Sequence, residues 1–551
     1  MSFSSRGQGV VCAIAASVCC ESALGVEQTV TWEGNGPGDT TLWSNAQNWN
    51  PQVVPCNLGP VEFNVVIPAG FSLVNHDAAA GDCTIRSLTL GDNTTLRITA
   101  GSSLMVTTTA NLCGILDARD NFTATQSKGT TAAFSCNRAR MTAVTAGIVT
   151  IDATYYDSTG LWGTDGMGSV ITFSWPLMTA SGTGTMLDLS GVMEINAGFS
   201  SGGNDNDHQK ITASGGALID LSGLQMMTAP VAGNDRVEFI ATGAGSLIDM
   251  SSLTELRDAG SGTYLLDLDA GGTIKTGGLT CHTPTPVTLD GAGSTFHVQG
   301  NLRADAALTI NLNTVDTQLD LDGSLFAGNL VDIIAADGAK LNVGGNFCYN
   351  HTNESELQLG GAIVQFDGSG PQPQMLEVGG FDLDTACILF SNDNFAFGQM
   401  IVGQPGQATT LELRNGIDNG NQPGAKQEAM YLFGLEGLPT LRILGGSTLV
   451  LNGINLYLCD TATHINDLFS GGETMIAFDE GFIALGEPQL TGDINGNGVV
   501  DGIDLGILLG NWSIPAGAPG CEDALNCPAD INCDGFVNGI DLGILLGNWT
   551  L

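Results

Sequence analysis

The sequence predicts a mainly β protein, a right-handed parallel β-helix or β-solenoid followed by a small α-helical domain. Glycine provides 77 of the 551 residues, about twice the usual share, and charged residues make up only 13%. Short runs of alternating apolar residues are closed by Gly, Asn, Asp or Ser, which is typical of short strands and tight turns. An antiparallel sandwich is the alternative, because short strands separated by turns suit it equally well.

Internal repeats carry the solenoid prediction, which covers residues 56–460. The clearest unit reads TASGTGTMLDLSGVMEI at 179–195 and recurs at 212–227 and 241–256. Asp188, Asp220 and Asp249 hold the same place in each copy. One strand of this length cannot bury its apolar face, whereas stacked coils can. Residues 461–490 are expected to form a transition between the solenoid and the C-terminal domain.

The charge balance excludes several classes of partner. Sixteen Lys and Arg against 57 Asp and Glu give a net charge of −41, so a face that neutralises phosphates is not expected and nucleic-acid binding is excluded. A hydrophobic content of 43% excludes wholesale disorder. No apolar run after Gly25 is long enough to span a bilayer, so we expect no membrane insertion of the mature chain.

Residues 1–25 are predicted to be a signal peptide. Arg6 precedes the apolar run GVVCAIAASVCC, which is too short to span a bilayer. Small residues at Ala23 and Gly25 place the cleavage after Gly25. The alternative is an N-terminal strand of the fold. The protein is therefore expected to be secreted, in the extracellular space or at the cell surface.

Cysteine usage agrees with export to an oxidising compartment. Of the 14 cysteines, 11 remain after the predicted cleavage. Cys56 is followed by Cys83, and Cys113 by Cys136, at similar spacings that favour disulfides among them. At least one disulfide is predicted among the crowded cysteines near the C-terminus, which are Cys521, Cys527 and Cys533. For the isolated cysteines a disulfide and a buried free thiol are equally expected; these are Cys281, Cys348, Cys387 and Cys459.

Residues 26–55 form a Trp-rich segment that contains Trp32, Trp43 and Trp49. This segment resembles the one that begins many exported bacterial β-solenoid proteins. The resemblance implies a cap, in which bulky rings cover the open end of the first coil. A sugar-stacking platform is the alternative function of the three rings.

A tandem repeat near the C-terminus has the spacing of a 12-residue calcium loop. TGDINGNGVVDGIDLGILLGNW at 491–512 recurs as PADINCDGFVNGIDLGILLGNW at 528–549. The predicted ligands of the first loop are Asp493, Asn495, Asn497, the Val499 carbonyl, Asp501 and Asp504. Those of the second loop are Asp530, Asn532, Asp534, the Phe536 carbonyl, Asn538 and Asp541. Calcium prefers hard oxygen donors such as these, so two Ca²⁺ ions are expected; turns without metal are the alternative.

A helix is predicted after each loop, with an apolar stripe that packs against its counterpart. The stripes are Leu505, Leu508, Leu509 and Trp512, and Leu542, Leu545, Leu546 and Trp549. The whole segment 491–551 resembles a type I dockerin, and the chain resembles secreted bacterial β-solenoid proteins with this domain at the C-terminus. The resemblance implies attachment to a cohesin-like domain, with partner choice at positions 10 and 11 of each loop, which are Gly502-Ile503 and Gly539-Ile540.

Catalytic residues are not identified from the sequence. The carboxylate pairs Asp267/Asp269 and Asp320/Asp322 each put two acids on one strand face, a spacing that could serve glycoside hydrolysis. Such pairs also arise by chance among 57 acids. Two function classes remain: a non-catalytic structural or binding solenoid, and a polysaccharide-degrading enzyme, either pectin lyase-like or a glycoside hydrolase. A polysaccharide is the expected ligand of the second class.

Overall fold

The computed structural model describes most of the chain between Val26 and Thr550. The described residues are 26–57, 59–124, 134, 136–163, 171–200, 205–328, 330–384, 394–417, 419, 428–488, 490–512, 527, 529–532 and 536–550. The predicted signal peptide, 1–25, lies outside them. Strands make up 45% and helices 6%, which confirms the prediction of a mainly β protein.

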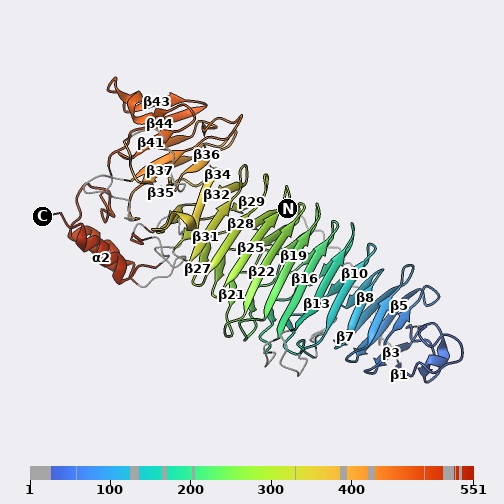
Figure 1. Ribbon diagram of the computed structural model, residues 1–551. Coiled ribbons are helices and arrows are strands. Elements are labelled where there is room, and N and C mark those ends of the chain that lie inside the picture. Colours follow the sequence, from blue (N-terminus) through green and yellow to red (C-terminus); the bar gives the residue numbers. More distant parts are fainter. Residues whose placement is uncertain are drawn as a thin grey trace, which may run out of the picture.

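Strands of the long stack fall into three columns (Figure 1). The first column contains β1 (Val26–Trp32), β2 (Trp49–Asn50), β3 (Val61–Ile67), β5 (Asp82–Leu90), β7 (Ser103–Leu112), β9 (Phe122–Ala124), β11 (Ile148–Ile151), β14 (Met186–Asp188), β17 (Leu218–Asp220), β20 (Leu247–Met250), β23 (Thr273–Thr276), β26 (Thr295–Val298), β29 (Gln318–Leu321), β32 (Lys340–Val343), β36 (Phe397–Val402), β38 (Ala429–Leu432), β39 (Leu441–Ile443), β41 (Asn455–Leu458) and β42 (Thr463–His464). The second contains β4 (Val74–His76), β6 (Thr95–Ile98), β8 (Ile115–Ala118), β10 (Arg140–Val144), β13 (Thr172–Ser181), β16 (Asn206–Ser214), β19 (Arg236–Thr242), β22 (Thr263–Asp269), β25 (Thr285–Asp290), β28 (Leu308–Leu312) and β31 (Val331–Ala335), and β34 (Leu357–Phe366) joins it to the first.

The third column forms a separate 13-stranded sheet. It contains β12 (Tyr155–Asp157), β15 (Glu194–Asn196), β18 (Met226–Thr228), β21 (Glu255–Arg257), β24 (Leu279–Cys281), β27 (Leu302–Ala304), β30 (Leu325–Ala327), β33 (Phe347–Tyr349), β35 (Gln374–Glu377), β37 (Thr410–Arg414), β40 (Thr448–Val450), β43 (Met475–Phe478) and β44 (Gly481–Ala484). Among the residues that the structure describes, three short 3₁₀ helices lie outside the strands: η1 (Ala46–Asn48), η2 (Glu354–Glu356) and η3 (Ile465–Phe469).

Parallel pairing between successive coils dominates the stack. Asp188 pairs with Asp220, and Asp220 pairs with Asp249, so the repeat found in the sequence is in register in space. Among the named strands, only β1–β2, β41–β42 and β43–β44 pair in antiparallel fashion. The antiparallel sandwich is therefore wrong, and the long parallel sheets are those of a solenoid. Parallel pairing also includes β1, in the predicted entry segment 26–55, and β44, in the predicted transition 461–490. The stack of strands is therefore longer than the predicted solenoid.

The core is a continuous interior column of apolar side chains. In the first column, in-register pairing stacks one buried residue per coil on the next. These residues are Leu187, Ile219, Ile248, Ile274, Phe296, Leu319, Leu341 and Val364, each 0% exposed. Alternate residues of a strand point to opposite faces, so the intervening polar residues face outward. The LDLS-type pattern is thus explained by one buried face per strand.

Close packing between coils accounts for part of the high glycine content. A Cβ on Gly272 would lie 2.0 Å from the Ala241 carbonyl oxygen of the preceding coil, and one on Gly223 would lie 2.1 Å from that of Ser190. Real Cβ atoms do not approach backbone oxygen so closely, so any larger residue would force the coils apart.

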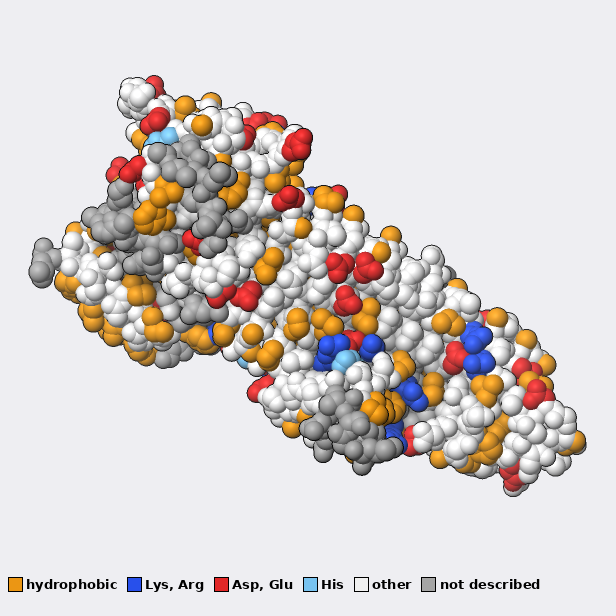
Figure 2. All heavy atoms as spheres, viewed as in Figure 1, with side chains coloured by type: hydrophobic (Ala, Val, Ile, Leu, Met, Phe, Trp, Pro, Cys, Tyr) orange, Lys and Arg blue, Asp and Glu red, His pale blue; other side chains and the backbone are white. Residues whose placement is uncertain are grey.

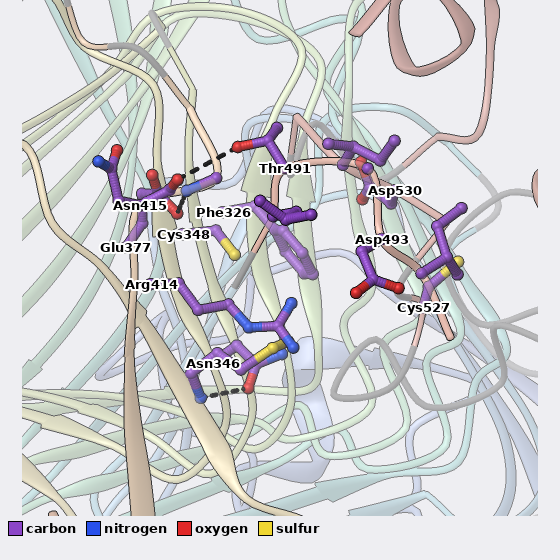
Figure 3. Close-up of a pocket in the computed structure, with 16 residues that line it drawn as sticks. Phe326, Asn346, Cys348, Glu377, Arg414, Asn415, Thr491, Asp493, Cys527 and Asp530 are labelled. Carbon is purple, nitrogen blue, oxygen red and sulfur yellow. Dashed lines mark hydrogen bonds between the residues drawn. The ribbon is translucent and has the colours of Figure 1, made fainter. Parts of the chain in front are cut away.

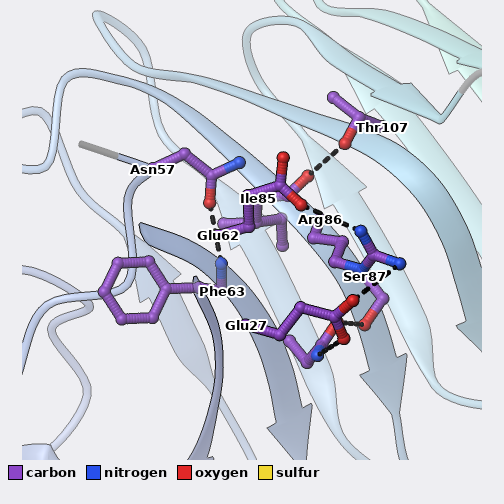
Figure 4. A network of polar contacts seen from close by, with 9 residues as sticks. Glu27, Asn57, Glu62, Phe63, Ile85, Arg86, Ser87 and Thr107 are labelled. Carbon is purple, nitrogen blue, oxygen red and sulfur yellow. Dashed lines mark hydrogen bonds and ion pairs between the residues drawn. The ribbon is translucent and has the colours of Figure 1, made fainter. Parts of the chain in front are cut away.

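The first coils are also joined by polar contacts (Figure 4). Arg86 of β5 contacts Glu62 of β3 at 2.9 Å and Glu27 of β1 at 3.0 Å. In the same network, the Ser87 hydroxyl donates to Asn64 Oδ1 at 2.7 Å. These three strands are neighbours, so one arginine offsets two carboxylates that would otherwise repel each other.

The three tryptophans of the N-terminal segment are buried, at 0% to 1% exposure. Trp49 packs edge-on against Trp32 and Trp43, with ring centroids 4.8 and 4.7 Å away. The Trp49 indole N–H donates to the Trp43 carbonyl, and that of Trp43 donates to the Pro55 carbonyl. Rings enclosed in this way offer no open surface for a sugar, which argues against the stacking platform.

Two of the predicted cysteine pairs are disulfides, Cys56–Cys83 and Cys113–Cys136. Cys281 is free and buried, whereas Cys348, Cys459 and Cys527 are disulfide-bonded. The free-thiol alternative is therefore wrong for Cys348 and Cys459. The other cysteines named above, Cys387, Cys521 and Cys533, lie outside the described residues.

In the described part of the chain after the solenoid lie two α-helices, α1 (Gly502–Gly510) and α2 (Gly539–Gly547). Figure 1 shows the module that contains α2 beside the C-terminal part of the solenoid. Across the described ranges, no helix is both long enough and apolar enough to cross a bilayer.

Candidate metal-binding module

The first predicted loop closes around the side chain of Asp493. Its carboxylate accepts hydrogen bonds from the backbone N–H of Asn497, at 3.1 Å, and of Gly498, at 2.7 Å. Asn495 Oδ1 also accepts from the Asn497 N–H, at 3.0 Å. Gly498 has a φ of +87°, a left-handed conformation that glycine adopts without strain. The sequence therefore places glycine where the loop reverses direction.

Position 12 of the first loop is a buried carboxylate that ties the loop to the helix. Asp504 is 0% exposed. Its Oδ1 accepts from the backbone N–H of Ile494, at 2.9 Å, and of Asn495, at 3.0 Å, and its Oδ2 accepts from that of Asp501, at 2.8 Å. The Asp501 side chain also accepts from the Ile503 N–H, and Asp501 and Asp504 form a reciprocal capping box at the start of α1.

The described part of the second loop repeats this geometry. Asp541 is 0% exposed and accepts from the N–H groups of Ile531, at 2.7 Å, and Asn538, at 2.8 Å. Asn538 caps α2 as Asp501 caps α1. Asp530, Asn532 and Phe536 are also described, whereas the predicted ligand Asp534 lies outside the described residues.

A small apolar core joins the two loop–helix units. Val500, Leu508, Ala529, Val537 and Leu545 are buried in it, at 0% to 1% exposure. Leu505, Leu542 and Trp549 pack against this core as partly buried residues. The predicted stripes are wrong at three further positions, because these side chains face outward: Leu509 is 52% exposed, Leu546 51% and Trp512 38%.

A cavity of about 90 Å³ lies between the module and the third column of strands of the solenoid. Asp493 and Asp530, the first residues of the two loops, line it on one side, and Glu377 and Arg414 line it on the other (Figure 3). Burial raises the pKa of Glu377 to about 8, although the Ile417 and Gly416 N–H groups and Arg414 act in the opposite direction. The solenoid thus places an arginine opposite the loop carboxylates.

Two further contacts hold the module against the solenoid. The Arg303 guanidinium of β27 lies 3.7 Å from the centre of the Phe536 ring, within the range of a cation–π interaction. The Thr491 hydroxyl donates to the Asn415 carbonyl at 3.4 Å. The sequence spacing gave no signal for Arg303 or Arg414, because their contacts depend on how two domains meet.

The donor chemistry of the two loops fits calcium. The side chains of the loop positions offer carboxylate and amide oxygens, and the remaining ligand at position 7 is a backbone carbonyl. Calcium takes six to eight oxygen ligands, which alternate residues of a tight loop can supply. Asp493 and Asn495 both accept from the Asn497 N–H, so their side-chain oxygens lie close together, and Asp504 accepts from the neighbouring N–H of Asn495.

The molecule is thus a β-solenoid-like stack that ends in a duplicated loop–helix module. Residues 491–547 match the model of the dockerin type I domain family, so the chain carries a type I dockerin domain at its C-terminus. Type I dockerins bind calcium and attach proteins to cohesin domains. A search of curated proteins and a search of solved structures each found no match.

The carboxylate pairs considered for catalysis lie on outward faces of the solenoid. Asp267 and Asp269 are on β22, where Asp269 pairs with Asp290 of the next coil. His297 lies 4.0 Å from Asp320 and 3.1 Å from Asp322. The sequence did not indicate Asp367, which is near Asp320: burial, together with the charges of Asp320 and Asp322, raises its pKa to about 6.

Proposed function

We propose that this chain is an exported, non-catalytic structural or binding β-solenoid that is attached to a cohesin-type partner through its C-terminal dockerin. The dockerin domain supports attachment of this type. Dockerin domains are typical of extracellular or cell-surface proteins, which agrees with the predicted signal peptide and with disulfides in the solenoid.

The outward apolar face of the dockerin carries this proposal. Ile503 and Leu509 on α1 are 59% and 52% exposed, and the equivalent Ile540 and Leu546 on α2 are 57% and 51% exposed. Figure 2 shows hydrophobic side chains gathered over the region of α2. Exposed apolar patches of this kind mark protein-interaction sites. Ile503 and Ile540 occupy position 11 of their loops, where the resemblance places partner choice.

Calcium completes the proposed module. We assign one ion to each loop, held by the twelve residues predicted above, and the ion would supply the positive charge that lets the loop carboxylates converge. Asp504 and Asp541 would then serve twice, because each also accepts hydrogen bonds from the N–H groups that begin its loop and its helix.

The remaining parts of the chain receive the following roles in this proposal. Residues 1–25 direct export, and residues 26–55 cap the first coil with three buried tryptophans. Residues 56–460 wind as a right-handed solenoid, residues 461–490 form the transition, and residues 491–551 form the dockerin. The aspartates of the clearest repeat hold turns, as Asp188 does by accepting from the Ser190 N–H, which supports a structural use of these acids.

Binding of the full chain to a panel of cohesin domains tests the attachment. We expect binding in calcium and none after chelation, and at least a tenfold loss in the double variant Leu509→Asp/Leu546→Asp. Leu438→Asp is the matched control, because Leu438 is also exposed, at 44%, but lies outside the dockerin. Equal binding by the double variant would show that another surface is used, and no binding to any cohesin would contradict the proposal.

A polysaccharide-degrading enzyme is the second candidate, and Asp367 is the observation in its favour. Glycoside hydrolases use two carboxyl groups of different pKa, and the pKa of Asp367 is raised to about 6 close to Asp320 and Asp322. Digestion of a polysaccharide panel by the wild-type chain, followed by loss of activity in Asp367→Asn, would favour this function. If neither the wild-type chain nor Asp367→Asn released digestion products, the enzymatic function would be rejected.

A further inference from the structure

A second group of metal-ligating side chains lies in the solenoid, outside both dockerin loops. It comprises Asp332 on β31, His351 after β33 and Glu356 at the end of η2. One ligand atom of each lies within 4.8 Å of those of the other two. We propose that these three side chains bind one divalent transition-metal ion of the zinc class.

The coil register brings the two carboxylates together. β31 and β34 pair in parallel, with Ile333 opposite Leu357 and Ile334 opposite Gln358. Asp332 and Glu356 are the residues just before this first pair, so they come side by side on successive coils. Asp332 lies between buried Val331 and Ile333, and its side chain therefore points away from the core, as side chains alternate along a strand.

The imidazole of His351 completes the group from a fixed position. Its side chain is 0% exposed, and Nδ1 lies 2.8 Å from Glu356 Oε2. The backbone carbonyl of His351 accepts a hydrogen bond from the Asn419 amide at 2.7 Å. The other ring nitrogen, Nε2, is buried without a hydrogen-bond partner in the described part of the chain. Nδ1, which faces Glu356, is the ring nitrogen that we assign to the ion.

The charges around the imidazole favour a bound cation. Burial raises the pKa of Asp332, and the neighbouring charge of Glu356 raises it further. Two carboxylates thus lie beside one imidazole, with one ligand atom of each group within 4.8 Å of those of the other two. A divalent ion between the three groups would compensate both carboxylates at once.

The donor set selects the class of metal. One imidazole nitrogen and two carboxylate oxygens suit zinc and its neighbours, whereas calcium prefers oxygen ligands alone. Ligand bonds near 2 Å place two ligands of a tetrahedral ion about 3.3 Å apart. The observed separation of 2.8 Å between Nδ1 and Oε2 reaches that value after a small rotation of Glu356, whose side chain is 36% exposed. Three protein ligands leave a fourth position for water.

Another histidine–carboxylate pair in the solenoid provides a matched control. His282 Nδ1 lies 3.0 Å from Asp305 Oδ2, almost the same separation as between His351 and Glu356. His282 belongs to none of the three-ligand groups found among the described residues. If a histidine beside a carboxylate were enough to bind zinc, both sites would respond to the metal.

Zinc titration of the full chain by calorimetry tests the proposal, with calcium in excess to fill the dockerin loops. We expect one zinc ion per chain and at least tenfold weaker binding in Asp332→Asn, His351→Gln and Glu356→Gln, with binding unchanged in His282→Gln. Cobalt in place of zinc should give visible absorption that Asp332→Asn removes. Circular dichroism checks each fold, and Asp332→Asn decides the test if the variant of the buried histidine does not fold.

Three outcomes would overturn the assignment. A wild-type chain that takes up no stoichiometric zinc would show that the three side chains form only a hydrogen-bonded cluster. Zinc binding that is unchanged in Asp332→Asn and Glu356→Gln would place the ion elsewhere. Displacement of the zinc by millimolar calcium would contradict the class of metal.

Discussion

Thr550 joins the end of the chain to the first dockerin loop, because its backbone N–H and its hydroxyl both donate to the Val500 carbonyl oxygen at 3.0 Å. The Val500 N–H in turn donates to the Thr550 hydroxyl oxygen. Val500 lies between two predicted calcium ligands, Val499 and Asp501. The residue that follows the second unit therefore fixes the backbone of the first loop.

Replacing Thr550 with Val should weaken the dockerin without unfolding the solenoid. The change removes both hydrogen bonds of the hydroxyl and leaves the buried Val500 N–H unpaired, which costs about 1–3 kcal/mol. Hydrogen exchange of the full chain should show faster exchange at Val500 and along α1. Thr550→Ser keeps the hydroxyl and serves as the control; equal exchange in both variants would contradict the role of this contact.

Calcium should contribute directly to dockerin folding. Among the described residues of the module, five side chains form the buried core, too few to stabilise about 60 residues alone. We expect circular dichroism of the 491–551 segment to show helix only with calcium, with dissociation constants of about 10⁻⁷ to 10⁻⁴ M. Replacing Asp493 and Asp504 with Ala should abolish the first site and loosen the second through the shared core. The same helical signal in chelator would refute this reading of the loops.

The solenoid should lose stability in mild acid through His76. Burial lowers the pKa of His76 to about 4, against the attraction of Asp77 and Asp82. Neither ring nitrogen has a hydrogen-bond partner among the described residues. The unfolded chain binds this proton below its ordinary value of 6.5, so stability falls as the pH drops from 6.5 to 4, by up to about 3 kcal/mol.

Unfolding measured at pH 7 and pH 4.5 tests this effect of His76. His76→Phe should show a smaller loss between the two pH values than the wild type. A His76→Phe variant with the full acid sensitivity of the wild type would assign that sensitivity to other groups.

The Cys56–Cys83 disulfide should stabilise the first coils. The two cysteines are separated by 27 positions in the sequence, a loop for which chain entropy predicts about 3–4 kcal/mol. Contacts in a solenoid are between neighbouring coils. The double variant Cys56→Ser/Cys83→Ser should therefore show faster amide hydrogen exchange than the wild type in β3 and β5, with little change in the distant strand β25. Cys281→Ser is the control, since Cys281 is buried and free. Uniform exchange along the stack would contradict this local effect.

The sequence predicted the features of this molecule that repeat or that are local. Asp188, Asp220 and Asp249 were aligned by their repeat and are aligned in space. The dockerin was predicted because its ligands fall within two short loops. A disulfide of Cys56 and Cys83 was favoured because the two are close in the sequence and the chain was expected to reach an oxidising compartment. In each case the distance along the chain fixes the distance in space.

Features that depend on packing between segments could not be predicted in this way. The period of α1 placed Leu508 and Leu509 on one stripe, yet only Leu508 is buried, because a short helix against one partner helix covers a narrow face. His351 and Asp332 carry no motif spacing, and the coil register brings them together. The Arg303 guanidinium contacts the Phe536 ring only because the dockerin lies against the third column of strands.

Because the coils are in register, the length of the solenoid can change by whole coils. Asp220 and Asp249 occupy equivalent positions on successive coils, so excision of residues 221–249 would join Asp220 to Met250 with the strands still aligned. The protein would shorten by one strand spacing, about 4.8 Å, while the tryptophan cluster and the dockerin kept their own structures. Duplication of the same stretch would lengthen it equally. The number of coils therefore sets the distance between the tryptophan cluster at one end of the solenoid and a partner bound to the dockerin at the other.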